Sequence, residues 1–129
     1  MKTVLTLLFV LQLTTALFAQ SNTPKLQLLY MQMQHCPWCH KMNREVFENP
    51  AIMQKLQSMY IIKKKNRGDR DLPAFVRPRF YPTTYILSAD GKKLLDELPG
   101  YMEPKRFADY LSDLYEIETE GKNTAVSAP

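Results

Sequence analysis

The sequence is poor in cysteine: its 129 residues include only two, Cys36 and Cys39. A disulfide between residues three positions apart closes a very small loop and removes little entropy from the unfolded chain. The further pairs of cysteines that a disulfide-stapled scaffold needs are absent. The two cysteines are therefore difficult to explain as architecture. With 45% hydrophobic and 23% charged residues, one domain can form a core without them.

No apolar run near the start of the chain is long enough to span a bilayer. Val4–Leu13 is interrupted by Thr and Gln, and a spanning helix needs about 20 apolar residues. Lys2, this apolar run and small residues such as Ala19 form the pattern of a secretory signal peptide. We expect residues 1–19 to be removed and the mature chain to be soluble in an oxidising compartment, which a periplasm provides. The cleavage site contains no cysteine that could carry a lipid anchor, so we do not expect one.

The charge of the chain is unevenly distributed. Residues 22–93 contain thirteen Lys and Arg against five Asp and Glu, a net of +8, whereas residues 94–129 contain three against eight, a net of −5. The densest basic run, Lys63–Arg70, is most simply a solvated loop. Nucleic acid is a poor partner for an exported protein. A basic surface near the cysteines would attract acidic partners and favour a thiolate.

Local patterns predict an α/β domain over residues 20–118, with a disordered tail over 119–129. Apolar and β-branched runs predict strands at Leu26–Met33, from Tyr60 into the lysines, at Thr83–Leu87 and at Lys92–Leu98. Helical spacing and capping residues predict helices at Pro37–Glu48, Ala51–Ser58 and Glu103–Glu116. A loop with one helical turn is expected over Gly68–Arg79, and Asp90-Gly91 predicts a hairpin turn. This order predicts a small mixed sheet between helices.

The cysteines lie where the first strand passes into the first helix. A thiolate at this point faces unpaired backbone N–H groups and the positive end of the helix dipole, which lowers the pKa of Cys36. Cys39 follows one turn later, close enough to attack a mixed disulfide on Cys36. We therefore expect Cys36 to be the exposed nucleophile and Cys39 the resolving thiol. Pro37 stiffens the turn, and Trp38 presents an aromatic face that limits access or contacts a partner.

These residues, taken with later ones, resemble the thioredoxin-fold disulfide oxidoreductases, in particular small exported members. The similarity rests on Cys36-Pro37-Trp38-Cys39 after a strand, Tyr81-Pro82-Thr83 opening a later strand, the Asp90-Gly91 hairpin and Gly100 before the last helix. It implies a thioredoxin-like fold in which a cis Pro82 packs against the active-site disulfide. It also implies that Tyr81, Pro82 and Thr83 contact a bound substrate strand.

The sequence departs from thioredoxin itself at Tyr30. In thioredoxin a buried acid at this position assists proton transfer at the resolving cysteine. This sequence has a tyrosine there, whose hydroxyl is far less acidic. Lys64 matches the lysine that accompanies the acid in that family. His35, if charged, would stabilise a thiolate on Cys36. Deprotonation of Cys39 is left to water, a lysine or a histidine.

Three alternatives remain open for the cysteine motif. Cys36-Pro37-Trp38-Cys39-His40 is also the attachment signature of a c-type haem, although the surrounding strands build a sheet that a small cytochrome does not need. His35 and His40 could join the thiols as zinc ligands, but structural zinc usually takes ligands from two separated pairs. A thioredoxin-fold binding module with an idle dithiol is the third.

The resemblance implies an exported thiol:disulfide oxidoreductase, and the compact chain favours a reductant. The dithiol is the redox centre, and we expect no metal or other cofactor. The expected partners are exported proteins with cysteines and a membrane electron donor of the thiol-relay type. We expect a monomer.

Overall fold

The computed structural model describes residues 23–126, and the side chains of residues 23–121. The predicted signal peptide, residues 1–19, lies outside the described residues. The elements follow the order predicted from the sequence. They are β1 (Leu26–Gln32), α2 (Pro37–Met42), the π-helical segment η2 (Asn43–Phe47), α3 (Pro50–Met59), β2 (Tyr60–Asn66), β3 (Thr83–Leu87), β4 (Leu94–Pro99) and α4 (Pro104–Val126).

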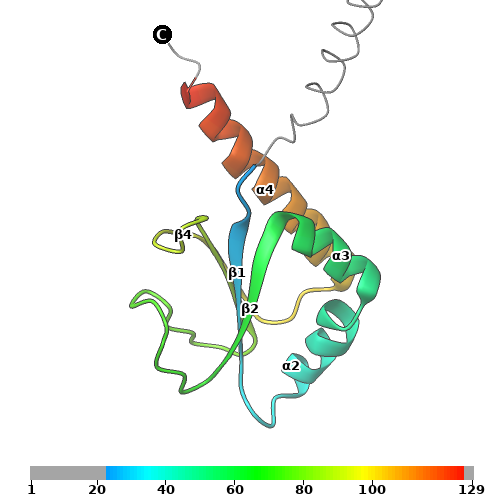
Figure 1. Ribbon diagram of the computed structural model, residues 1–129. Helices are drawn as coiled ribbons and strands as arrows, with labels where there is room; N and C mark the ends of the chain where they lie inside the picture. Colours follow the sequence, from blue (N-terminus) through cyan, green and yellow to red (C-terminus); the bar gives the residue numbers. More distant parts are fainter. Residues whose placement is uncertain (1–22, 127–129) are drawn as a thin grey trace, which may run out of the picture.

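The four strands form one mixed sheet in the order β2-β1-β3-β4 (Figure 1). β1 pairs with β2 in parallel and with β3 in antiparallel orientation, and β3 pairs with β4 as a hairpin. Gly91 closes this hairpin with φ +72°, and an added Cβ would lie 3.0 Å from the Gln27 side chain. The positive φ therefore favours glycine at this turn, and a larger residue would also require the Gln27 side chain to shift.

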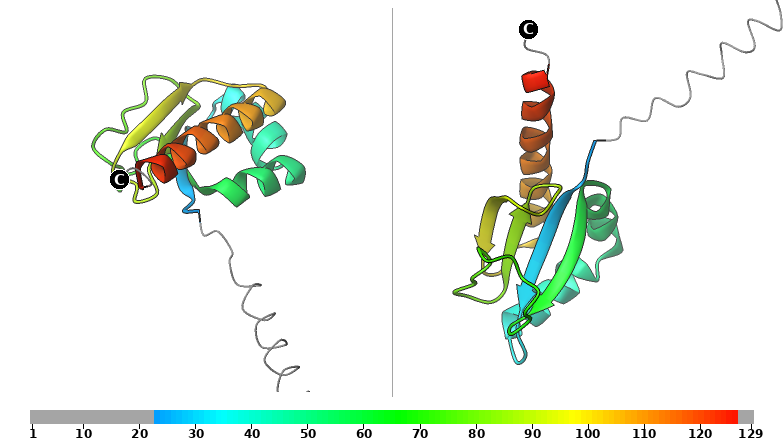
Figure 2. Two further views of the ribbon diagram at one scale, coloured as in Figure 1. Left: turned by 90° about the horizontal axis from the view of Figure 1, so that it is seen from above. Right: turned by 60° about the vertical axis from the view of Figure 1, so that its left-hand side comes forward.

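The helices all pack on one face of the sheet, as the view from above shows (Figure 2). Leu28 and Tyr30 of β1 and Ile86 of β3 meet helical residues there, including Phe47 and Phe107. The opposite face is covered by the connection between β2 and β3, which contributes the buried Val76. Both faces of β1 are thus buried, which explains its continuous apolar sequence. The α/β class is confirmed, although the sheet does not lie between helices as predicted.

The helix predicted over Pro37–Glu48 forms with a change of winding in its second half. In η2 the N–H of Glu48 donates to the carbonyl of Asn43 at 2.8 Å, a bond across five residues. The side chain of Asn43 also donates to Gln32 of β1 and accepts from Lys64 of β2. The π-helical turn begins at the residue that makes these contacts with two strands. We infer that the change from α- to π-helical winding depends on these contacts and not on local sequence alone.

The loop contains the single turn predicted for it, whereas the tail differs from the prediction. At Pro73–Val76 the N–H of Val76 donates to the carbonyl of Pro73, which closes one hydrogen-bonded turn. The tail predicted to be disordered from Thr119 is helical as far as Val126. Its small polar residues suggested disorder, but the Thr119 hydroxyl donates to the carbonyl of Tyr115 and the helix simply continues.

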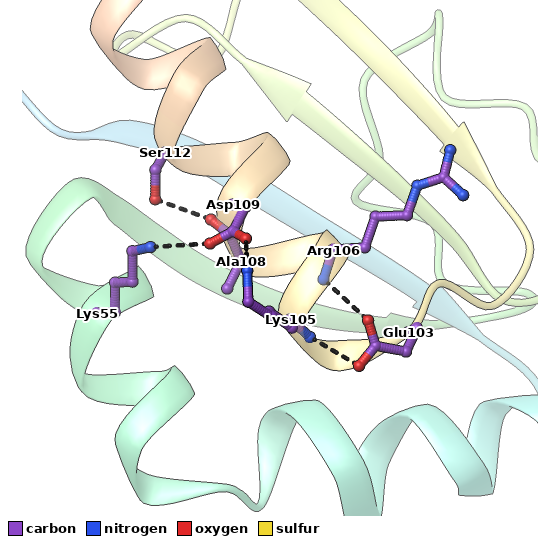
Figure 3. Close-up of polar contacts among 7 residues, drawn as sticks. All are labelled: Lys55, Glu103, Lys105, Arg106, Ala108, Asp109 and Ser112. Carbon is purple, nitrogen blue, oxygen red and sulfur yellow. Dashed lines mark hydrogen bonds and ion pairs between the residues drawn. The ribbon is translucent and has the colours of Figure 1, made fainter.

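Contacts at its first turns fix α4 to α3 (Figure 3). The carboxylate of Glu103 accepts from the backbone N–H groups of Lys105 and Arg106, which caps the helix start. Asp109 then pairs with Lys105 on the same helix and with Lys55 of α3. The N-terminal part of α4 is therefore anchored to α3, whereas its far end projects beyond the sheet (Figure 2). Among residues 23–126, no helix is both long and apolar enough to cross a membrane.

Candidate active site

Cys36 and Cys39 form a disulfide at the junction of β1 and α2. The chain leaves β1 through a turn in which His35 adopts φ +56°, and Cys36 is the N-cap residue of α2. Pro37 occupies the first turn of the helix as predicted, where it needs no hydrogen-bond partner for its nitrogen. The backbone N–H of Cys39 donates to the Cys36 sulfur at 3.2 Å. This contact places Cys36 where a thiolate would be stabilised.

The disulfide is buried, contrary to the prediction of an exposed Cys36. Cys36 is 3% exposed and Cys39 is 2% exposed. The carbonyl oxygen of Tyr81 lies 3.7 Å from the Cys36 sulfur and covers it. In the disulfide this sulfur has no proton to donate, so the approach is a packing contact; a Cys36 thiol could donate to the same oxygen.

The segment before β3 forms the second wall of the site. The Tyr81–Pro82 peptide bond is cis, as predicted. The carbonyl of Pro82 accepts a hydrogen bond from the N–H of Gly100 at 2.7 Å, which ties this segment to the end of β4. Thr83 does not fit a direct substrate contact, because it is fully buried and its hydroxyl donates to the carbonyl of Phe80. Thr83 therefore shapes the turn that presents Tyr81.

Tyr30 lies below the dithiol and is fully buried. Its hydroxyl donates to the carbonyl oxygen of Cys39 at 3.3 Å, and burial raises its pKa above the ordinary value. The side chain is thus a neutral donor to the helix backbone near neutral pH. It positions Cys39 without offering a base.

Lys64 pairs with Tyr30 across β1 and β2, but its ammonium group points elsewhere. The ammonium donates to the Asn43 side chain at 3.1 Å and lies 4.8 Å from the centre of the Phe47 ring. Burial lowers its pKa, and the nearby charge of Glu48 opposes this shift. These contacts link β2 to the helical layer, so a proton-transfer role for Lys64 has no support in its partners.

The two histidines, His35 and His40, are both exposed beside the dithiol. Within the residues that the structure describes, no three His, Cys, Asp or Glu side chains gather in a way that could hold a metal ion.

Sequence reasoning missed an aromatic cleft beside the disulfide. It has a volume of about 440 Å³ and is lined by Trp38, Phe80, Tyr81, Pro99, Gly100 and Tyr101. The Trp38 and Tyr101 rings lie 5.5 Å apart, and the Lys41 ammonium lies near both. Tyr101 donates to the Glu45 carboxylate, and this hydrogen bond raises the pKa of Tyr101 to about 12. The only available signal was the position of two aromatics directly beside Tyr81 and Gly100.

Comparison with solved structures finds the same fold in thioredoxins and in a domain of DsbD. The periplasmic thioredoxin SoxS from Paracoccus pantotrophus is 22% identical, with a TM-score of 0.56 over 70% of this chain and 96% of that chain. The DsbD C-terminal domain from Neisseria meningitidis is 17% identical, with a TM-score of 0.53 over 78% and 95%. A thioredoxin from Thermus thermophilus is 18% identical, with a TM-score of 0.53 over 84% and 85%.

No curated protein matches the sequence. The thioredoxin-like domain family matches it over residues 11–115, which includes β1, the dithiol, the cis-proline segment and about half of α4. The chain is therefore a member of the thioredoxin-like domain family.

Proposed function

We propose that the protein is an exported thiol:disulfide oxidoreductase that acts on cysteines of other proteins and works as a reductant. The observation that carries this proposal is the Cys36–Cys39 disulfide at the start of α2, with the Cys36 sulfur accepting from the Cys39 N–H. The dithiol needs no further cofactor for this chemistry. One of the similar structures is a periplasmic thioredoxin by its title, which supports export.

The exchange proceeds in two displacements. In the reduced protein the Cys36 thiolate attacks one sulfur of a substrate disulfide, forms a mixed disulfide and releases the other substrate sulfur as a thiolate. The Cys39 thiolate then attacks the Cys36 sulfur, closes the Cys36–Cys39 disulfide and releases the second substrate sulfur. Two electrons pass to the substrate, and its two thiolates take up the protons that the dithiol lost. A dithiol of a membrane thiol-relay protein would restore the reduced form by the reverse exchange.

The burial of Tyr30 affects the second displacement. Because the Tyr30 hydroxyl stays protonated and donates to the Cys39 carbonyl, it cannot accept the Cys39 proton. Deprotonation of Cys39 is then left to water or a histidine, because the Lys64 ammonium donates to Asn43. Substrates could be apocytochromes awaiting haem, proteins of sulfur metabolism or misoxidised exported proteins.

The asymmetry of the two sulfurs gives the direct test. Cys39→Ser should accumulate mixed disulfides with partner proteins, because no thiol remains to resolve them, whereas Cys36→Ser should not. Non-reducing gels followed by mass spectrometry of the captured species measure this. Equal trapping by both variants, or trapping by Cys36→Ser alone, would show that the roles are reversed or absent.

The direction of electron flow has its own test. Potentials of proteins with this fold run from about −270 mV for thioredoxin to about −120 mV for the oxidant DsbA. The few charged groups near the Cys36 sulfur would not cover that span, so we expect a value near the reducing end. A glutathione redox titration followed by the fluorescence of Trp38, the sole tryptophan, measures it. A potential above about −160 mV would contradict the reductant assignment and leave the dithiol mechanism intact.

An absorption spectrum distinguishes the haem alternative from the proposed function. His40 follows the dithiol directly and is exposed, but the motif lies between a buried strand and a sheet-packed helix. A Soret band with covalently retained haem in the purified protein would contradict the proposed function and indicate a c-type haem electron carrier.

A further inference from the structure

The connection between β2 and β3 carries four arginines and no lysine. They are Arg67, Arg70, Arg77 and Arg79, which we call the arginine loop, and all four are exposed. Among residues 23–121, none of them pairs with an acidic side chain. Arginine is always charged and binds carboxylates through two parallel hydrogen bonds. The arginine loop therefore presents guanidinium groups whose charge no neighbour within the domain neutralises.

The lysines just before this loop already have partners within the domain. The ammonium groups of Lys63 and Lys64 donate to amide side chains of β1 and η2, and Lys65 pairs with Asp71. The hydrogen bond with Asp71 and the charges of Asp71 and Asp69 raise the pKa of Lys65. Both acids of the connection thus act on a strand lysine. The excess positive charge lies on the arginine loop.

The arginine loop begins and ends beside the dithiol. The N–H of Arg67 donates to the carbonyl of Gln32 at 2.8 Å, at the end of β1 from which the chain continues to Cys36. Arg79 comes shortly before Tyr81, whose carbonyl lies 3.7 Å from the Cys36 sulfur. A protein that reaches Cys36 therefore passes close to arginines at both ends of the loop.

Acidic residues gather at the opposite end of the molecule. Residues 110–121 of α4 include Asp113, Glu116, Glu118 and Glu120, and no Lys or Arg. This part of the helix projects away from α2, whereas the connection between β2 and β3 lies toward the dithiol end of the sheet (Figures 1 and 2). Such a separation of charge turns the dithiol end toward a negative surface before contact and increases the rate of productive encounters.

A protein with acidic side chains suits this arrangement better than an anionic membrane. Because the arginine loop flanks Cys36, a membrane bound there would cover the sulfur. Lipids also offer no disulfide for exchange. A protein can present its carboxylates and its cysteine on the same surface.

We propose that the arginine loop recognises redox partners that carry Asp and Glu residues around their reactive cysteine. This inference rests on the proposed function, since it names the partner class of the same site. Contacts between guanidinium groups and carboxylates hold the partner while its sulfur exchanges with Cys36. Because these arginines are exposed, salt weakens the contacts.

Two peptides test this recognition. Each has a single cysteine joined by a disulfide to 2-mercaptoethanol, and several residues away from it one peptide carries glutamates where the other carries glutamines. Stopped-flow Trp38 fluorescence gives the rate constant with which each peptide oxidises the reduced protein. Division by the rate constant with dithiothreitol, an uncharged dithiol, removes the effect of the glutamates on the disulfide itself. The corrected Glu-to-Gln ratio should be about tenfold at about 0.01 M salt and should approach one at about 1 M.

Arg67→Gln combined with Arg79→Gln should reduce the low-salt ratio to about threefold or less. Lys92→Gln combined with Lys93→Gln is the matched control. It removes the same charge at an exposed turn, beyond the end of β3 that pairs with the start of β1 and so away from the dithiol. This control should keep the wild-type ratio. A low-salt ratio near one in the wild-type protein, an unchanged ratio in the arginine variant or an equal fall in the lysine variant would overturn the proposal.

A second measurement separates this inference from the proposed function. If 2-hydroxyethyl disulfide fails to oxidise the reduced wild-type protein, the exchange activity itself is absent. Fluorescence anisotropy of labelled Glu and Gln peptides, with serine in place of cysteine, then tests the arginine loop without electron transfer. Tighter binding of the Glu peptide at low salt would support the recognition, and equal affinities would overturn it.

The membrane alternative has its own outcome. Vesicles of phosphatidylcholine and phosphatidylglycerol in equal parts are sedimented with the wild-type protein and with the arginine variant. A peptide ratio near one, together with sedimentation of the wild-type protein but not of the arginine variant, would assign the arginine loop to a lipid surface and overturn the proposal.

Discussion

At the scale of single residues, the site depends on a few backbone contacts that surround the two sulfurs. The N–H of Cys39 and the carbonyl of Tyr81 both lie against Cys36, and the hydroxyl of Tyr30 holds the carbonyl of Cys39. None of these contacts requires a charged side chain. The properties of the dithiol therefore depend mainly on where the backbone is placed.

Tyr30→Phe tests whether the Tyr30 hydroxyl positions the helix or moves protons. Removing it should lower the free energy of unfolding by about 1 kcal/mol, since the buried carbonyl of Cys39 loses a donor. The pH dependence of oxidation by a small disulfide should keep its shape. Urea denaturation and stopped-flow rates measure the two effects. Tyr85→Phe is the control, because Tyr85 is buried in the other core cluster, away from Tyr30; a shifted pH profile in Tyr30→Phe would instead indicate proton transfer.

At the scale of elements, local signals specified the strands and the helix starts well. β3 has the bounds predicted from its β-branched and aromatic run, and Asp90-Gly91 forms the predicted turn. The end of α4 and the winding of η2 were not predictable in the same way. Composition suggested a disordered tail, and the wide turn at Asn43 depends on strands distant in sequence.

Capping of α3 by Asn49 allows a test at this scale. Its side-chain oxygen accepts from the N–H groups of Ala51 and Ile52 at 3.1 and 3.3 Å. Asn49→Ala should lower the free energy of unfolding by about 1 kcal/mol, and Asn49→Asp should recover most of the loss. Urea denaturation measures both. Gln54→Ala, at an exposed position of α3, should have little effect; an equal loss there would mean that the cap is not responsible.

At the scale of the whole molecule, the sheet holds two parts of the site together. The helical layer carries the dithiol, and the loop before β3 carries the cis-proline segment. The dithiol could be identified from sequence because its four residues are contiguous. The cleft could not, because Phe80 and Tyr101 come from separate loops that meet only when β3 pairs with β4. The burial of Cys36 was missed for the same reason, since its cover comes from Tyr81.

Buried tyrosines make the stability of the whole domain sensitive to alkaline pH. Burial raises the pKa values of Tyr30 and Tyr60 well above 10 and that of Tyr85 to about 12. A raised pKa in the folded state means full stability below the unfolded value near 10 and a loss as pH rises toward the folded value. Each such tyrosine should remove about 1.4 kcal/mol per pH unit in that window.

Urea denaturation of the oxidised protein at pH 8, 10 and 11 measures this slope. Tyr60→Phe should flatten it by about 1.4 kcal/mol per pH unit, and should also cost about 1 kcal/mol at neutral pH because the Tyr60 hydroxyl donates to the carbonyl of Leu111. A stability that is level between pH 8 and 11 would show that these hydroxyl groups ionise as freely in the folded protein as in the unfolded one.

The far end of α4 has a practical consequence for how the protein can be held. The helix runs for 23 residues, about 35 Å, and both its last turn and the start of β1 leave the domain on the side opposite α2 (Figures 1 and 2). A linker, bead or surface attached near Val126 would therefore leave the disulfide pointing outward. A column of protein immobilised in this way should still exchange disulfides with large partners, and so should retrieve them from a cell extract.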